Sequence, residues 1–456
     1  MKQEEAGKAF RETDEKAEKG NNKIADKTIL IPPAVDRIIK RLGEHGFEAY
    51  AVGGCVRDTL LGRFPEDWDI TTSAHPREVK GIFPRTIDTG IQHGTVTVMD
   101  NHTGYEITTY RIDGEYEDGR HPKSVAYTAS LTEDLKRRDF TINAMAYSHE
   151  RGIVDEFRGM EDLKNRIIRC VGNPIDRFTE DALRILRAIR FSAQLGFEIE
   201  ENTVQAIRII APNMAKVSKE RIQTELTKLL LSDHPEKISL VFERGIAPYI
   251  SSRFYQVDED RKMAGQRGWF ILAEAEKRLL KKKTEKLEHE KALRWAAFLR
   301  FSGPEGAAEV LRSLKMDNDT IGRVKVLVQW CYLPIEAEHT GVRQAMSRIK
   351  EAFDDLLYLK RFVILADLEE GSEKEKAEAC LADLDAIEKI KEEIKKAGDC
   401  LCLRDLAVTG GDLIEAGLKP GKEIGEMLQR LLEDVLKFPE HNTKKYLMDL
   451  AFRRGM

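Results

Sequence analysis

The chain has 456 residues, which is too long for one hydrophobic core and predicts two to four domains. The formal net charge is −5, so the charge of the whole chain does not indicate nucleic-acid binding, and any RNA-binding surface must be local. No run of 18 uncharged apolar residues occurs, and the N-terminus is too charged for a signal peptide, which predicts a cytoplasmic protein without a membrane span.

The first third of the chain mixes helical and strand patterns. Apolar residues recur at helical spacing over residues 33–47, after a polar extension over residues 1–30. Short β-branched runs then predict strands, and DNHTGY predicts a hairpin turn between the last two of them. These runs are EAYAVGG, DWDITT, GTVTVMD and YEITTYR.

Helical periodicity dominates from about Gly159 onward. It is clearest in KEIGEMLQRLLEDVLK, where apolar residues follow the i, i+3, i+4, i+7 pattern. The sequence therefore predicts an α+β protein, with a small mixed sheet near the N-terminus and an all-α remainder.

Two acids stand one residue apart in DWDITT. If this run is a strand, Asp67 and Asp69 share one face, and Trp68 and Ile70 face the packed side. Carboxylates this close repel each other unless a cation lies between them, and Mg²⁺ favours one or two carboxylates together with phosphate oxygens. For an isolated D-x-D, a pair of solvated strand-end acids is the simpler interpretation.

Two neighbouring features favour the metal site. Gly53 and Gly54 follow an apolar strand and open a helix, so their amides can form a phosphate-binding turn within reach of Arg57. Glu106 lies in the middle of YEITTYR and supplies a third acid if that strand pairs beside DWDITT. Together these features predict a two-metal phosphoryl-transfer site.

The order of motifs then resembles a known family. GG-x-VRD, D-x-D, RRDFTINAMA (137–146), D-x-x-x-G-x-x-D (155–162) and EDALRILRAIRF (180–191) are similar to the bacterial class II tRNA nucleotidyltransferases. This group of the polymerase β superfamily contains CCA-adding enzymes and bacterial poly(A) polymerases. The resemblance implies a polymerase-β-like catalytic head at 31–158, followed by a helical neck at 159–230, a body at 231–350 and a tRNA-binding tail at 351–456.

The resemblance also implies roles for individual residues. Asp67 and Asp69 would bind Mg²⁺ and act in catalysis with Glu106, while Gly53, Gly54 and Arg57 would contact the nucleotide. Arg138 would contact the triphosphate and Asp139 the ribose. The nucleotide pocket would be lined by Asp181, Arg184, Arg187 and Arg190. The implied partners are tRNA, CTP and ATP, and pairing into homodimers is left open.

An aspartate and an arginine are sufficient to choose a base. Aspartate only accepts hydrogen bonds and arginine only donates them. Cytosine and adenine both present an exocyclic N–H beside a ring-nitrogen acceptor, whereas uracil and guanine present the reverse polarity. Asp181 and Arg184 would therefore select C and A without a nucleic-acid template. The alternative is an ordinary ion pair on a solvent-exposed helix face, without a role in base recognition.

Several related activities compete with full CCA addition. The segment 110–130 occupies the place of the family's flexible loop and is undeleted, which favours CCA addition over partial CC or A addition. Poly(A) synthesis is a further alternative. A non-catalytic RNA-binding protein would need a lost carboxylate or a broken RRD, and neither is seen. None of the ten histidines precedes an aspartate, so no phosphohydrolase activity is expected.

Overall fold

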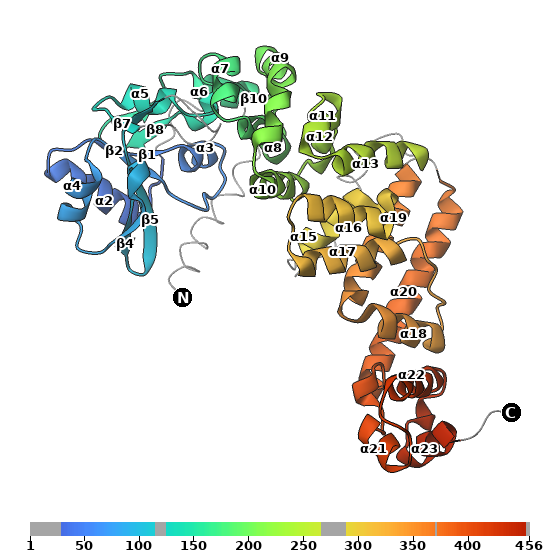
Figure 1. Ribbon diagram of the computed structural model, residues 1–456. Coiled ribbons are helices and arrows are strands. Elements are labelled where there is room, and N and C mark those ends of the chain that lie inside the picture. Colours follow the sequence, from blue (N-terminus) through green and yellow to red (C-terminus); the bar gives the residue numbers. More distant parts are fainter. Residues whose placement is uncertain (1–28, 115–124, 266–288, 370–371, 453–456) are drawn as a thin grey trace, which may run out of the picture. The chain divides into compact units, whose positions relative to one another are not determined.

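The computed structural model describes residues 29–114, 125–265, 289–369 and 372–452 (Figure 1). The chain forms two compact units, and a boundary between them falls within one helix, α8 (Leu183–Leu195). The first unit consists of Met1–Ala188 and Phe197–Ile210, and the second of Ile189–Gly196 and Ala211–Met456. The predicted extension over residues 1–30 lies almost entirely outside the described residues, and the division into five domains stays a prediction.

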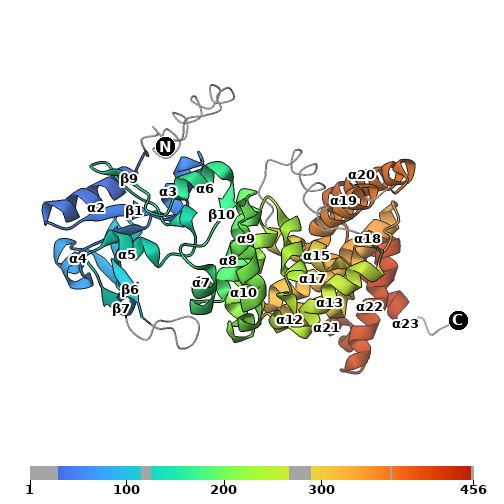
Figure 2. The same ribbon diagram turned by 90° about the horizontal axis from the view of Figure 1, so that it is seen from above.

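A seven-stranded sheet is the centre of the first unit (Figures 1 and 2). The strand order is β3-β4-β5-β2-β1-β8-β9. β2 and β5 run parallel and the other neighbouring pairs run antiparallel, so the expected mixed sheet is confirmed. The strands are β1 (Ala49–Val52), β2 (Ile70–Thr72), β3 (Thr86–Gly90), β4 (Thr95–Asp100), β5 (Thr103–Thr109), β8 (Ala146–Ser148) and β9 (Gly152–Val154).

The turn between β4 and β5 is the hairpin that DNHTGY predicted. Asp100 pairs with Thr103, which leaves Asn101 and His102 as the loop. Both loop residues have positive φ, 47° and 69°. Positive φ at both central residues is the pattern of a tight type I′ turn.

Strand β1 is buried along its whole length, which explains its continuous apolar run. Helix α2 (Pro33–Glu44), which contacts β1 and β2, buries Val35, Ile38 and Leu42. Tyr50 and Val52 belong to a second buried cluster that includes Leu135 of α5. The sheet therefore has packed side chains on both faces at β1.

The first unit contains further elements outside this sheet. A two-stranded parallel sheet, β10 with β11, lies after Gly159, where strand signals were expected to fade. The elements are α3 (Gly54–Leu60), α4 (Pro76–Ile82), η1 (Ile91–His93), β6 (Arg111–Asp113), β7 (Val125–Tyr127), α5 (Leu131–Lys136), η2 (Thr141–Asn143), α6 (Gly159–Asn165), β10 (Ile167–Ile168), α7 (Pro174–Glu180), β11 (Glu198–Ile199) and α9 (Glu201–Ile210).

Within the described ranges of the second unit every assigned element is helical, as expected. Trp295, Phe254 and Phe298 are fully buried, and the Phe298 ring contacts the rings of the other two. The helices are α10 (Lys219–Leu230), α11 (Ser239–Glu243), α12 (Ala247–Ile250), α13 (Ser252–Met263), α15 (Glu290–Leu299), α16 (Gly303–Ser313), α17 (Asn318–Trp330), α18 (His339–Ile349), α19 (Phe353–Glu369), α20 (Lys374–Ala397), α21 (Gly410–Glu415), α22 (Lys422–Lys437) and α23 (Lys444–Phe452), with short 3₁₀ turns between some of them.

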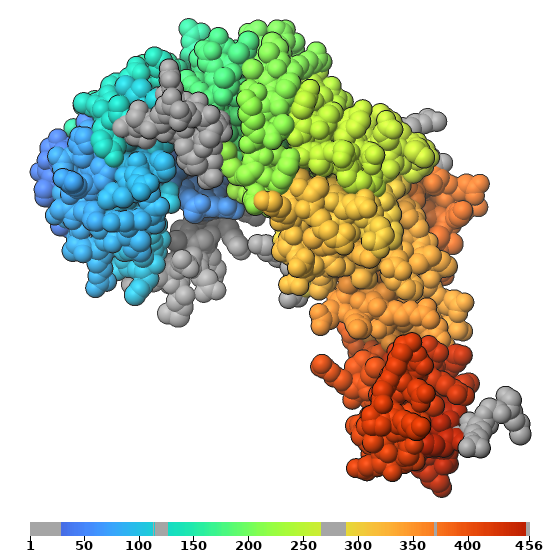
Figure 3. All heavy atoms as spheres, in the orientation of Figure 1, coloured from blue at the N-terminus to red at the C-terminus, as the bar shows by residue number. Residues whose placement is uncertain are grey.

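The last part of the second unit, red in Figure 3, has a core of its own. Helix α22 has the bounds that KEIGEMLQRLLEDVLK predicted. It buries Leu431, Leu432 and Val435 against residues such as Leu413 and Leu447. Among the helices in the described ranges, none combines the length and apolar character that a membrane span requires.

Candidate active site

Three acids meet where β2 and β5 run side by side. Strand β2 begins at Ile70, so Asp67 and Asp69 lie in the segment that leads into the strand, and not within the strand as expected. Ile70 pairs with Ile107 in parallel register, which places Asp69 level with Glu106. All three carboxyl residues are exposed. The strand that carries Glu106 therefore does pair beside the D-x-D segment.

Asp69 is the electrostatic centre of this group. Although the residue is exposed, the surrounding protein desolvates its carboxylate, and this desolvation is the largest cause of a raised pKa. The nearby guanidinium of Arg138 opposes the rise, while the negative charges of Glu106 and Asp67 add to it. Asp69 is thus repelled by the two other carboxylates, and a cation bound there would relieve the repulsion.

The Gly53–Gly54 turn lies between two arginines. A Cβ atom on Gly53 would come within 3.1 Å of Arg138 Nη1, and one on Gly54 would lie 3.7 Å from Arg57 Nη2. The Gly53 N–H donates to the Met145 carbonyl oxygen at 3.1 Å. The expected phosphate-binding turn therefore offers fewer backbone donors than predicted, because the Gly53 amide already has a partner. The positive charge at the turn comes from the flanking guanidinium groups.

Substituting Gly53→Ala tests whether this close approach matters. Gly53 has φ +83°, and an added methyl group would also push on the Arg138 guanidinium. We expect kcat/KM for the nucleotide transfer that the sequence predicts to fall about 10-fold, because small displacements of binding groups are costly in catalysis. Gly46→Ala is the matched control, since Gly46 has φ +84° but no atom within 4 Å of the added Cβ. Equal activity losses in the two variants would assign the effect to backbone strain alone.

A buried hydrogen-bond chain connects α3 with α8. Arg57 donates from Nε and Nη2 to the Asp58 carboxylate, and from Nη1 to Asn143 Oδ1 at 2.6 Å. Asn143 Nδ2 donates to Asp139 Oδ1 at 3.1 Å. Asp139 Oδ2 accepts from Arg187 Nε at 2.8 Å and pairs with Nη2 at 2.6 Å. Two predicted nucleotide contacts, Arg57 and Arg187, are thus linked through protein atoms.

Asp139 is held ionised by this chain. Burial would raise the pKa of its carboxyl, but the Arg187 and Arg184 guanidinium groups outweigh burial and hold the pKa below its usual range. Its carboxylate also accepts the Phe140 N–H at 2.9 Å. The predicted ribose contact stays a prediction, because both Asp139 oxygens already have protein partners.

The predicted base-reading residues do not share one continuous helix as expected. Helix α7 ends at Glu180 and α8 begins at Leu183, so Asp181 lies in the break, with extended backbone. Its side chain accepts the Leu183 N–H at 3.0 Å. Arg184 Nη1 bonds Glu180 Oε2 at 2.6 Å and the Arg177 carbonyl oxygen at 3.1 Å. The break frees Asp181 from the helical spacing of the arginines, and its carboxylate caps the new helix.

Arg190 has a packing role in the second unit. Its side chain is buried, and Nε bonds Glu225 Oε2 of α10 at 2.5 Å. Nη1 bonds Gln194 Oε1 at 2.6 Å, and the guanidinium carbon lies 3.9 Å from the centroid of the Phe191 ring. The nucleotide contact predicted for Arg190 stays a prediction, because the guanidinium is engaged with protein groups.

Sequence reasoning missed Asp134, a fully buried acid in α5. Its carboxylate accepts Thr71 Oγ1 at 3.0 Å, Arg137 Nε at 2.9 Å and Arg138 Nη2 at 3.4 Å. Burial would raise the pKa of Asp134, but Arg137 and Arg138 lower it below the usual value. Asn143 was also missed, and an amide inside the apolar run FTINAMAY was the available signal.

The D-x-x-x-G-x-x-D motif holds the segment around Asn143. Asp155 accepts the backbone N–H of Gly159 at 2.7 Å, at the start of α6. A Cβ on Gly159 would lie 2.4 Å from the Thr141 carbonyl oxygen, so only glycine permits this packing. Asp162 accepts Thr141 Oγ1 at 2.6 Å. The motif therefore fixes η2, the short helix that carries Asn143.

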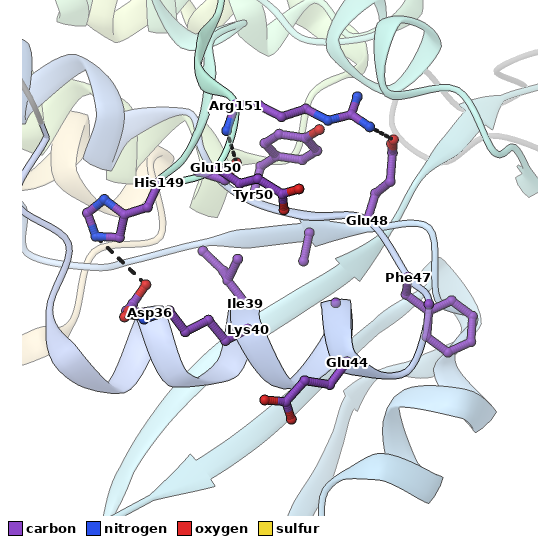
Figure 4. Close-up of a pocket in the computed structure, with 14 residues that line it drawn as sticks. Asp36, Ile39, Lys40, Glu44, Phe47, Glu48, Tyr50, His149, Glu150 and Arg151 are labelled. Carbon is purple, nitrogen blue, oxygen red and sulfur yellow. Dashed lines mark hydrogen bonds and ion pairs between the residues drawn. The ribbon is translucent and has the colours of Figure 1, made fainter.

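A cavity of about 680 Å³ lies elsewhere in the first unit, between α2 and the β8–β9 turn (Figure 4). Two ion pairs line it, Asp36 with His149 at 3.7 Å and Glu48 with Arg151 at 3.0 Å. None of the predicted site residues lines it. The cavity adjoins Tyr50 near the N-terminal end of β1, whereas Gly53 follows the other end, so we assign it no part in the site.

The acids suit a metal ion that phosphate helps to bind. Within the described part of the chain, no three His, Cys, Asp or Glu side chains converge closely enough to hold an ion unaided. Mg²⁺ does not need such a cage, because it commonly takes one or two carboxylates and completes its shell with substrate phosphates and water. Asp67 and Asp69, with Glu106 level with Asp69, offer hard oxygen donors of this kind.

The predicted flexible loop lies partly outside the described residues. The ends of the segment 110–130 form the antiparallel pair β6 and β7, and residues 115–124 are not described. Arg111 Nη1 donates to the His93 carbonyl oxygen, and the Tyr127 ring lies edge-on to His75 at 4.8 Å. The two ends of the segment are thus joined to the first unit by specific contacts.

Three family models match the chain in sequence order. The poly A polymerase head domain matches residues 49–169, which contain the glycine turn and the three acids. A probable RNA- and SrmB-binding site of polymerase A matches residues 196–252. A putative tRNA nucleotidyltransferase domain 2 matches residues 286–451. Together the models cover most of both units.

Individual proteins agree with the family models. The CCA-adding enzyme of Limosilactobacillus fermentum is 38% identical over 416 residues, covering 91% of this chain and 95% of that enzyme. The crystal structure of the Bacillus stearothermophilus CCA-adding enzyme with CTP is 32% identical, with a TM-score of 0.73 over 92% of this chain and 98% of the other. A Thermotoga maritima CCA-adding enzyme complexed with tRNA, 22% identical over 92% of this chain and 95% of that one, shares the fold with a TM-score of 0.57. The chain therefore belongs to the family of class II CCA-adding enzymes and poly(A) polymerases.

Proposed function

We propose that the protein adds C, C and A in turn to the 3′ end of tRNA, using CTP and ATP and no nucleic-acid template. The observation that carries the proposal is the placement of Asp69 level with Glu106, with Arg138 acting on Asp69 and also flanking the Gly53 turn. Similarity to CCA-adding enzymes over nearly their whole length supports the same activity.

The carboxylates and the arginines have different roles in the proposed nucleotidyl transfer. Asp67, Asp69 and Glu106 would hold Mg²⁺, which lowers the pKa of the tRNA 3′-hydroxyl and offsets charge on the phosphates when bound. The 3′-oxygen attacks the α-phosphorus, and the bond to the β-phosphate bridging oxygen breaks to release pyrophosphate. Arg138 and Arg57 beside the glycine turn stabilise the negative charge of the phosphates.

Base choice falls to Asp181 and Arg184. The carboxylate accepts the exocyclic N–H of cytosine or adenine, and the guanidinium donates to the ring nitrogen. In the present structure both side chains have protein partners, the Leu183 N–H and Glu180. The bound base would share or replace these partners, and uracil or guanine would set donor against donor and acceptor against acceptor.

The test is nucleotide incorporation into tRNAs that lack their last three, two or one nucleotides. With labelled CTP and ATP together, we expect all three substrates to end at CCA, and tRNA that already ends in CCA to gain nothing. CTP alone should give CC ends, and ATP alone should extend only the CC end. Addition restricted to C or to A would make the protein a partial enzyme, and unlimited A addition would make it a poly(A) polymerase.

A further inference from the structure

Asn143 is the central residue of the buried chain between α3 and α8. Only 7% of its surface is exposed, and its two amide atoms have different partners. Oδ1 accepts from Arg57, and Nδ2 donates to Asp139. A guanidinium can only donate and a carboxylate can only accept, so the position requires an acceptor and a donor on one short side chain. Asparagine meets this requirement, and the isosteric aspartate does not.

The two partners lead to different parts of the proposed nucleotide site. Arg57 is in α3, next to the Gly53–Gly54 turn, which serves the phosphates. Asp139 holds Arg187, one turn along α8 from Arg184, which serves the base. Asn143 is thus a direct hydrogen-bonded link between the phosphate side and the base side, and it lies within the first unit together with all its partners.

The backbone around Asn143 gives the side chain a fixed origin. Its N–H donates to the Phe140 carbonyl oxygen at 2.9 Å. Thr141, two residues earlier, is held by Asp162 through its hydroxyl and donates its N–H to the Arg169 carbonyl oxygen at 2.9 Å. These contacts fix the backbone of the segment. Because the backbone cannot shift to compensate, a change to the Asn143 amide would alter the orientation of the Arg57 and Arg187 side chains.

We propose that Asn143 is a positioning residue that couples phosphate binding to base selection by orienting Arg57 and, through Asp139, Arg187. The proposal deepens the proposed function and rests on it. Under this proposal, Asn143 affects base selectivity without contacting the base. If the groups that bind the phosphates and those that bind the base are no longer fixed relative to each other, a wrong base can shift to avoid its unfavourable contacts, and selectivity falls.

The first experiment compares Asn143→Asp and Asn143→Ala with the native protein in single-nucleotide addition. We expect kcat/KM for CTP and ATP to fall about 10²-fold, and the preference for CTP over UTP to fall at least about 10-fold. Asn202→Asp is the matched control, because Asn202 is exposed and also bonds a carboxylate, that of Glu200. Unchanged CTP/UTP preference in both Asn143 variants would overturn the proposal, even if the rates fell.

A second experiment measures how the two arginines act together, first with Asn143 in place and then in the Asn143→Ala background. Arg57→Lys and Arg187→Lys are measured singly and together. If Asn143 couples the two arginines, the combined loss is smaller than the product of the single losses, and Asn143→Ala makes the losses multiply. Losses that multiply already with Asn143 present would overturn the coupling. A native protein that adds neither C nor A to tRNA would instead refute the proposed function.

Discussion

Replacing either Asp67 or Asp69 by alanine should reduce nucleotide transfer by on the order of 10³-fold or more. The two side chains supply the negative charge that would hold Mg²⁺, and Asp69 interacts with Asp67, Glu106 and Arg138 at once. Single-turnover addition of labelled CTP to tRNA lacking its last three nucleotides measures the change.

The controls for this prediction separate chemistry from binding. Glu66→Ala removes an adjacent exposed acid that has no assigned role and should retain the native rate. Both aspartate variants should still bind tRNA with native affinity in a filter-binding assay. Transfer by either variant at more than a tenth of the native rate would contradict the assignment of that carboxylate.

Removing Glu225 should destabilise the second unit by about 3 kcal/mol, because Arg190 is then left as a buried cation without its carboxylate. Trp295 of α15 is a suitable probe, since its indole N–H donates at 3.0 Å to Thr227, which lies in α10 together with Glu225. Urea unfolding of Glu225→Ala, followed by Trp295 fluorescence in a background where Trp68, Trp269 and Trp330 are phenylalanine, measures the loss.

A second pair on α10 provides the matched control. Glu220 bonds Lys315 at 2.8 Å, but both side chains are exposed to solvent. Such pairs contribute little because water solvates the separated charges nearly as well. Glu220→Ala should therefore leave the urea midpoint unchanged. Equal shifts for the two variants would show that the Arg190–Glu225 pair gains nothing from burial.

Local patterns in the sequence predicted several secondary-structure elements well. The apolar spacing of KEIGEMLQRLLEDVLK gave the bounds of α22, and DNHTGY gave the β4–β5 turn. Glu106 was predicted beside the D-x-D segment on the condition that its strand pairs there, and β5 does pair with β2. These features depend on side-chain period and turn chemistry, which neighbouring residues specify.

Helix breaks and contacts with distant residues were not predictable in this way. Periodicity placed Asp181 on the same helix as Arg184, but the aspartate caps a new helix instead. The Gly53 amide is engaged by Met145, and Arg190 by Glu225, a residue 35 positions away. The contacts of Gly53 and Arg190 could be predicted only from knowledge of which segments pack together. A row of arginines at helical spacing has the same sequence pattern on an exposed face as on a buried one.

The β4–β5 turn has a consequence for insertions and deletions. Strand β5 is paired on one side with β4 and on the other with β2, and that second pairing brings Glu106 level with Asp69. One residue added between Asn101 and His102 would lengthen this two-residue loop. If the longer loop did not absorb the residue, β5 would slip by one position against β4 or β2, which turns alternate side chains to the opposite face. Such a slip would turn Glu106 away from Asp69 while the composition of every strand stayed the same.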